Sequence, residues 1–224
     1  MSNTYQPPIL TVDSVIFMII NDELSVLLIE RADEPFKGKW ALPGGYCAAG
    51  ETTHAAMARI LSTKAGLKTT SLSLVEQLYT FDTVARDPRG HAVSVTYMGL
   101  GEAIEIKKSS TAQKPQFFPV KKLPELAYDH GDIIKYANDR LISKISYTNA
   151  AYALLPKLFT MTQLQSVYEA ILGHDLDKRN FRKKYLSLDI VEPTSDYYQE
   201  GAHRPAQLYK FKQQNLQTHS RSID

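Results

Sequence analysis

The stretch of residues 42–67, LPGGYCAAGETTHAAMARILSTKAGL, constrains the fold more than any other part of the chain. A proline and three glycines break its first part into a loop whose backbone can come close to a ligand. The alanine-rich run that follows predicts a helix over residues 53–65, and Gly66 stands where a helix C-cap is expected. The stretch therefore predicts a ligand-approaching loop that leads directly into a helix.

The spacing within this stretch resembles the Nudix box of the nucleoside-diphosphate hydrolases. Six residues match the box in register over 23 positions: Gly45, Glu51, Arg59, Leu61, Gly66 and Leu67. The alternative is a chance glycine-rich loop before an unrelated helix. The loop-to-helix context and the six matches favour the Nudix interpretation.

The resemblance breaks down where the family has its three metal-binding glutamates, because Ile60, Thr63 and Lys64 stand there. Positions spaced i, i+3 and i+4 share one helix face. A hard divalent cation needs oxygen ligands, and this face offers an alkyl group, a hydroxyl and an ammonium. We therefore expect no metal site, no catalytic residue and no hydrolysis, in a scaffold that still binds its ligand.

The chain around the box has the strand pattern of a mixed sheet. Residues 9–20 and 24–30 predict a hairpin that turns at Asn21 and Asp22. Further strands are expected at residues 72–81, 91–100 and 117–120, followed by a helix over residues 129–145. This part, residues 1–147, is predicted to be an α/β Nudix sandwich, a mixed sheet with flanking helices.

Residues 79–97, with their Arg-Asp-Pro-Arg-Gly run, resemble the ADP-ribose pyrophosphatases and their relatives, which implies a ligand related to ADP-ribose. Lys64 is a candidate to replace the metal ion at the ligand's pyrophosphate. Two alternatives remain open: Lys64 lies in solvent while Arg59 only pairs with Glu51, and Arg86 and Arg89 belong to a solvated hairpin. The candidate ligand-binding residues are Arg31, Gly45, Glu51, Arg59, Lys64, Phe81, Asp82 and Arg86.

Residues 148–224 have a different pattern, which predicts an α+β winged helix-turn-helix. A helix capped by Thr162 is expected to end at Gly173, before a basic helix over residues 177–186. Two short strands follow, at residues 190–193 and 207–211. The charges on such a helix often only face the solvent. Here, however, the basic helix stands at the position of the recognition helix, which contacts DNA. The candidate DNA-binding residues are Lys178, Arg179, Arg182, Lys183, Lys184 and Arg204.

Together the two parts resemble one family, the Nudix-related transcriptional regulators or NrtR. The resemblance implies a homodimeric repressor of NAD metabolism genes that senses ADP-ribose or a related NAD metabolite. Because one monomer presents one basic helix, specific binding favours a two-fold dimer on a palindromic double-stranded operator. Three alternatives remain: a Nudix hydrolase of ADP-ribose-type nucleoside diphosphates, a sugar-responsive regulator of the same architecture, and a protein-interaction module.

The composition excludes several other classes. The single cysteine, Cys47, cannot form an intrachain disulfide, and no spacing suggests a zinc site or another cofactor. No apolar run approaches the ~20 residues of a membrane helix, and the first residues lack the pattern of a signal peptide. We therefore expect a cytoplasmic protein with no membrane partner. The net charge of +2 is too small to indicate a basic tail.

Overall fold

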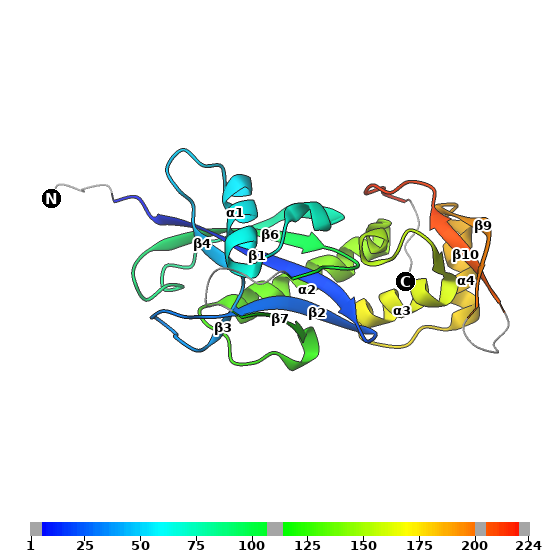
Figure 1. Cartoon of the computed structure of the whole chain (residues 1–224), viewed down its shortest axis with the longest axis horizontal. Coiled ribbons are helices and arrows are strands. Elements are labelled where there is room, and N and C mark those ends of the chain that lie inside the picture. Colours follow the sequence, from blue (N-terminus) through cyan, green and yellow to red (C-terminus); the bar gives the residue numbers. More distant parts are fainter. Residues whose placement is uncertain (1–5, 107–113, 200–204, 220–224) are drawn as a thin grey trace.

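The computed structural model describes residues 6–106, 114–199 and 205–219. The molecule is elongated, with the Nudix-like part at one end and the winged-helix part at the other (Figure 1). The Nudix-like part contains β1 (Ile9–Ile20), β2 (Glu23–Glu30), β3 (Trp40–Ala41), β4 (Gly44–Tyr46), α1 (Thr53–Ala65), η1 (Thr69–Ser71), β5 (Leu74–Phe81), β6 (Ala92–Leu100), β7 (Pro115–Pro119), η2 (Val120–Lys122) and α2 (His130–Tyr147). The winged-helix part contains η3 (Ala150–Leu154), β8 (Phe159–Thr160), α3 (Met161–Leu172), α4 (Lys178–Ser187), β9 (Val191–Tyr198) and β10 (Ala206–Phe211).

The larger sheet is mixed, as predicted, and has the strand order β3-β2-β1-β6-β5. β1 and β2 form the expected antiparallel hairpin, and Asn21 and Asp22 turn it with positive φ angles of 50° and 59°. β1 also pairs in parallel with β6 and antiparallel with the short β4. The β4 pairing places the glycines of the box loop beside Asp13 of β1.

Two helices cover the two faces of this sheet. α1 buries Met57, Ile60 and Leu61 against one hydrophobic cluster, and α2 buries Ile133 and Leu141 in another. The cluster under α2 continues without interruption into the winged-helix part, where it includes the core residues of α3 and α4. The two parts of the chain therefore share a hydrophobic core at their junction.

Helix α3 begins two residues earlier than the sequence suggests. Its N-cap is Thr160, whose hydroxyl accepts a hydrogen bond from the N–H of Gln163, while the Gln163 side chain accepts from the N–H of Thr160. This reciprocal capping box satisfies two backbone donors, and Thr162, the predicted cap, lies inside the helix. Gly173 ends the helix in the left-handed conformation, as expected.

Helix α4 follows the prediction closely, with Asp177 as its N-cap and with Phe181 and Tyr185 buried. Both aromatic rings contact Tyr168 of α3, with centroid distances of 5.3 and 5.6 Å. The wing strand β9 is longer than predicted and continues past Pro193 to Tyr198, because a proline is tolerated on an edge strand. Predicted wing residue Arg204 lies outside the described residues.

The described C-terminal segment returns to the link between the two parts. Asn149 donates a hydrogen bond to the carbonyl of Asn215 and accepts one from the N–H of Gln217, at 3.0 and 2.7 Å. Thr148 pairs with Thr218 in an isolated β-bridge. These contacts fix the backbone immediately after α2. Among the described residues, no helix has the length and apolar character needed to span a bilayer.

Candidate functional site

The box loop is held in place by a charge pair that spans it. Arg59 of α1 donates two hydrogen bonds of 2.8 Å to the carboxylate of Glu51 and a third to the carbonyl of Tyr46. The Glu51 carboxylate also accepts from the N–H of Ala48. The Arg59 guanidinium and this backbone donor lower the pKa of Glu51 to about 2. Both Glu51 oxygens are thus occupied in holding the loop.

The three positions that carry glutamates in the Nudix pattern do not fit a divalent cation. Ile60 is buried in the core, and the Thr63 hydroxyl bonds back to the carbonyl of Arg59 at 2.8 Å. The Lys64 ammonium points at the box loop and donates to the carbonyl of Gly44 at 2.6 Å. Within the described residues, no group of three histidine, cysteine or acidic side chains could hold a metal ion.

Glycine is required in this loop because the backbone runs directly against β1. A Cβ atom added to Gly44 would lie 1.8 Å from Oδ1 of Asp13. At Gly45 the nearest atoms would be Cδ1 of Ile60 and Nζ of Lys64, both at 3.4 Å. The glycine pair therefore brings the loop, the sheet and the Lys64 ammonium together at one place.

Behind this loop lies a buried charge cluster built on Arg86. Its guanidinium donates two hydrogen bonds to Asp129, at 2.8 and 2.9 Å, and contacts Asp13 at 3.4 Å. The Ser94 hydroxyl donates to the same Asp13 carboxylate at 2.6 Å. The cluster joins β1, β6 and the start of α2 to the loop that follows β5.

His130, the first residue of α2, is buried beside the cluster. Its Nδ1 accepts a hydrogen bond from the N–H of Leu42 at 2.9 Å, and its Nε2 lies 3.7 Å from Oδ1 of Asp13. Burial lowers the pKa of His130, although the Asp13 charge opposes the shift. The ring is therefore neutral, with its proton on Nε2.

The box loop, β1, α1 and the start of α2 surround a pocket of about 340 Å³, a size that suits a small organic ligand. Four of the predicted ligand-binding residues line it: Arg31, Gly45, Arg59 and Lys64. The sequence missed several other lining residues, namely Asp13, Tyr46, Asp87, Tyr128 and His130. Arg89, which the sequence raised only as part of a hairpin, also lines the pocket.

The other four predicted residues lie outside the lining. Phe81 packs against Tyr136 of α2, and Asp82 is exposed after the end of β5. Arg86 belongs to the buried charge cluster behind the pocket, and the Glu51 carboxylate is bound by Arg59 and by the backbone of the box loop. The hairpin interpretation of Arg86 is wrong, because its side chain is only 4% exposed.

The pocket contains cations that lack a carboxylate partner. Arg31 donates to the backbone carbonyls of Pro35 and Asp33, and Lys64 donates to the carbonyl of Gly44. In the described part of the chain, neither side chain forms an ion pair with a carboxylate. Burial lowers the pKa of Lys64, and the nearby Arg31 charge lowers it further. Two positive charges without a paired carboxylate therefore line the pocket, and the charges of Asp13 and Asp33 offset that of Lys64 only in part.

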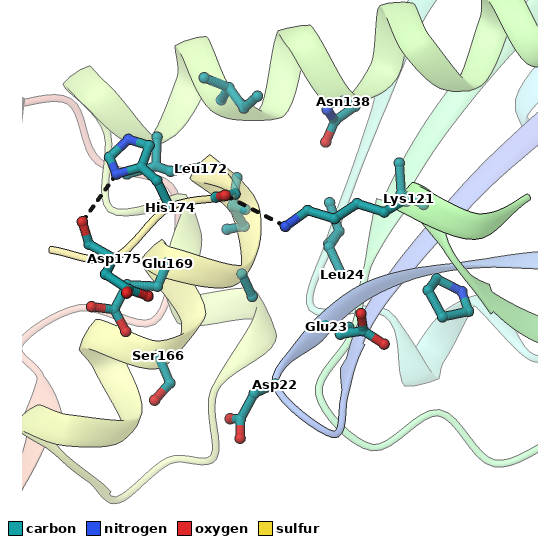
Figure 2. A pocket seen from close by; sticks show the side chains of 16 residues that line it. Asp22, Glu23, Leu24, Lys121, Asn138, Ser166, Glu169, Leu172, His174 and Asp175 are labelled. Atoms are coloured by element: carbon teal, nitrogen blue, oxygen red, sulfur yellow. Dashed lines mark hydrogen bonds between the residues drawn. The ribbon is translucent and has the colours of Figure 1, made fainter.

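A second cavity, of about 420 Å³, lies at the junction of the two parts (Figure 2). It is lined by the turn between β1 and β2, by η2, by α2 and by the end of α3. Lys121 of η2 reaches across it to the carbonyl of Gly173, at 3.5 Å. None of the residues predicted to bind ligand or DNA lines this cavity.

The predicted DNA-binding residues of α4 lie at the end of the molecule opposite the N-terminus (Figure 1). Lys178, Arg179, Arg182 and Lys183 are exposed, whereas Lys184 is half-buried. Arg182 donates a hydrogen bond of 3.1 Å to the Tyr209 hydroxyl on the wing strand β10. The structure thus brings the basic helix and the wing together on one exposed surface.

Comparison with known proteins decides the family. Residues 151–211 match the NrtR DNA-binding winged helix domain, and residues 10–137 match the NUDIX domain. The chain is 38% identical to the ADPR responsive transcriptional repressor NtrR of Acinetobacter baylyi, covering 94% of this chain and 85% of that protein. The chain belongs to the NrtR family.

Solved structures of the NrtR family agree with this assignment. Shewanella oneidensis NrtR complexed with a 27mer DNA matches with a TM-score of 0.80 and 31% identity, covering 96% of this chain and 99% of that one. The Nudix domain of the same protein complexed with ADP ribose matches with a TM-score of 0.53 and 33% identity, covering 63% and 93%. The predicted fold class, a Nudix sandwich followed by a winged helix-turn-helix, is confirmed.

The neutral state of His130 leads to a prediction about pH. The unfolded chain takes up a proton on this histidine near pH 6.5, whereas the folded protein resists protonation. The contribution of His130 to the free energy of unfolding is therefore fully present above pH 6.5 and is lost as pH falls through the lower folded pKa. Nitrogen-detected NMR should show a neutral His130 with its proton on Nε2 at about pH 6.

A substitution separates this histidine from the other titrating groups. His130→Gln should reduce the loss of unfolding free energy measured by urea denaturation between pH 7 and about pH 5.5. A doubly protonated His130 near pH 6, or an unchanged loss in the variant, would contradict the assignment.

Proposed function

We propose that this NrtR-family chain is an ADP-ribose-responsive transcriptional repressor that binds DNA through α4 and the wing. Its Nudix domain, within residues 1–147, binds the ligand without hydrolysing it, and residues 148–224 bind the operator. The observation that carries the proposal is the pair of cations, Arg31 and Lys64, in the pocket of the box loop. Regulation of NAD metabolism genes by a homodimer on a palindromic site belongs to the same proposal, on the strength of the family resemblance.

The pocket suits a nucleoside diphosphate for electrostatic reasons. Two positive charges in a partly dry pocket repel each other, and an anion between them relieves that repulsion. Lys64 stands on the helix face where the Nudix pattern holds its metal ion, and its ammonium occupies a comparable place beside the glycine loop. A pyrophosphate group, with its two negative charges, matches this arrangement without a metal ion.

The absence of hydrolysis follows from the same three positions. Hydrolysis in this fold depends on a divalent cation that activates water and neutralises the phosphates. Ile60 is buried and has no oxygen, and the Lys64 amine donates its hydrogen to the carbonyl of Gly44, so neither supplies the oxygen ligand that such a cation needs. The alternative function, a Nudix pyrophosphohydrolase, predicts release of AMP from ADP-ribose when Mg²⁺ or Mn²⁺ is added, and we expect none above background.

The DNA surface supports the second half of the proposal. The exposed basic residues of α4 can contact phosphates and base edges, while Phe181 and Tyr185 anchor the helix from beneath. The hydrogen bond from Arg182 to Tyr209 fixes the orientation between helix and wing. One such surface per chain favours a two-fold dimer, whose two copies of α4 meet half-sites about one helical turn or a multiple apart.

Ligand binding by Lys64 is tested by calorimetry with ADP-ribose. Wild-type protein should bind in EDTA as tightly as in Mg²⁺, and Lys64→Ala should bind about tenfold more weakly, the loss of one charged hydrogen bond. Lys64→Glu should bind still more weakly, because it places a negative charge beside the pyrophosphate. Lys68→Ala, an exposed lysine outside the pocket, is the matched control and should bind as wild type does. Wild-type affinity in both Lys64 variants would contradict the role of this side chain.

DNA binding is tested with duplexes from the region upstream of the gene and its neighbours. If Lys183 contacts a phosphate, Lys183→Ala should weaken specific and non-specific binding alike and lower the salt slope by about one. Lys68→Ala again serves as the control. Unchanged affinity and salt slope in Lys183→Ala and Arg182→Ala would show that α4 is not the DNA-contacting helix.

A further inference from the structure

Tyr128 lies in the wall of the ligand pocket near two guanidinium groups. Its ring centroid is 4.9 Å from the guanidinium carbon of Arg31 and 5.8 Å from that of Arg89. Phe36 and His130 contact the same ring, at 4.9 and 5.3 Å between centroids. Tyr128 therefore lies beside cations that can attract an anion to this pocket.

The hydroxyl of Tyr128 is a buried donor without a partner among the described residues. Within the described part of the chain, no other hydroxyl of this kind belongs to a residue that lines the ligand pocket or the junction cavity. A buried unpaired hydroxyl costs folding free energy, and a ligand that accepts its hydrogen bond recovers that cost. Burial raises the pKa of Tyr128 against the opposing charges of Arg31 and Arg89, so the hydroxyl keeps its proton and can donate.

The backbone at Tyr128 is also in an unfavourable conformation. Its φ angle is +55°, in the left-handed region that bulky side chains rarely occupy. The next residue, Asp129, is the N-cap of α2 and is held by Arg86, and His130 is the first residue of the helix. A shift at Tyr128 therefore acts directly on the start of α2.

Helix α2 connects this position to the winged-helix part. It runs from His130 to Tyr147, and its middle residues Asn138 and Ile142 line the junction cavity opposite the end of α3. Figure 2 shows Asn138 pointing from α2 toward the cavity, with Lys121 reaching to the end of α3. A small movement of α2 therefore changes its packing against the helix that supports α4.

We propose that ligand binding shifts Tyr128 so that its hydroxyl, which is buried in this structure, donates a hydrogen bond to a phosphate oxygen of the nucleoside diphosphate. This shift of Tyr128 relays the bound state to α2 and the DNA-binding part. This inference rests on the proposed function, because it takes the ligand to be an ADP-ribose-like diphosphate. Tyr128 is then both a ligand-contacting residue and the first element of the response.

Tyr128→Phe is the variant that tests this role, because it removes the hydroxyl and keeps the aromatic ring near the two guanidinium groups. We expect the affinity for ADP-ribose to fall about tenfold by calorimetry. The change in DNA affinity caused by saturating ADP-ribose should be smaller than in wild type. The melting temperature of the ligand-free variant should equal or exceed that of wild type, since a buried unpaired donor is removed. Tyr79→Phe, which changes an exposed tyrosine on β5 outside the pocket, should behave as wild type in all three measurements.

Three results would overturn the proposal. The first is wild-type ADP-ribose affinity in Tyr128→Phe, and the second is a full DNA response of the variant at saturating ligand. The third is a melting temperature several degrees lower, which would assign the hydroxyl a structural hydrogen bond instead. Failure of the wild-type protein to bind ADP-ribose is a separate outcome that contradicts the proposed function itself.

Discussion

The buried guanidinium of Arg86 is the interaction on which the arrangement of the ligand pocket depends. It connects Asp13 on the central strand β1 with Asp129 at the start of α2, and its side chain is only 4% exposed. Removal of one member of a buried ion pair typically costs about 3–5 kcal/mol, because the remaining charges lose their partner. The cluster explains why the loop after β5, the glycine loop beside Asp13 and the first turn of α2 occupy fixed positions around one cavity. Arg86 itself does not line the pocket, but its ion pairs hold Asp13 and Asp129 beside it.

The second constraint is the hydrophobic core that the two parts share. The cluster beneath α2 includes Leu164, Val167 and Tyr168 of α3, and the Tyr168 hydroxyl contacts the carbonyl of Ile145 at 3.5 Å. The segment after α2 is further held by the hydrogen bonds of Asn149 with the C-terminal segment. A helix packed in this way cannot move at one end without changing its contacts at the other, because a close-packed interior is not freely deformable. Helix α2 is thus the physical connection between the ligand pocket and the DNA-binding surface.

The elements with local signals could be predicted from the sequence, and the pocket only in part. Helix α1 has its predicted bounds because the alanine-rich run favours a helix and Gly66 marks its end, and the structure adds Thr52 as its N-cap. The start of α3 was misplaced because Thr160 and Thr162 are both possible caps, and the choice depends on the side chain of Gln163. Tyr128 and Asp13 escaped prediction because only tertiary packing joins β1 to the start of α2. Phe81 is a predicted ligand residue because its segment resembles that of a pyrophosphatase, and in the structure it packs against Tyr136 outside the pocket lining.

We expect the ligand pocket and α4 to be thermodynamically coupled in one chain. The most direct measurement is a pair of titrations of the wild-type protein: fluorescence anisotropy with upstream DNA at zero and saturating ADP-ribose, and calorimetry with ADP-ribose in the absence and presence of that DNA. Coupled sites must change each other's affinity by the same factor, which is typically about 5 to 150. We expect equal factors within that range. DNA and ADP-ribose affinities that do not depend on each other would contradict this coupling.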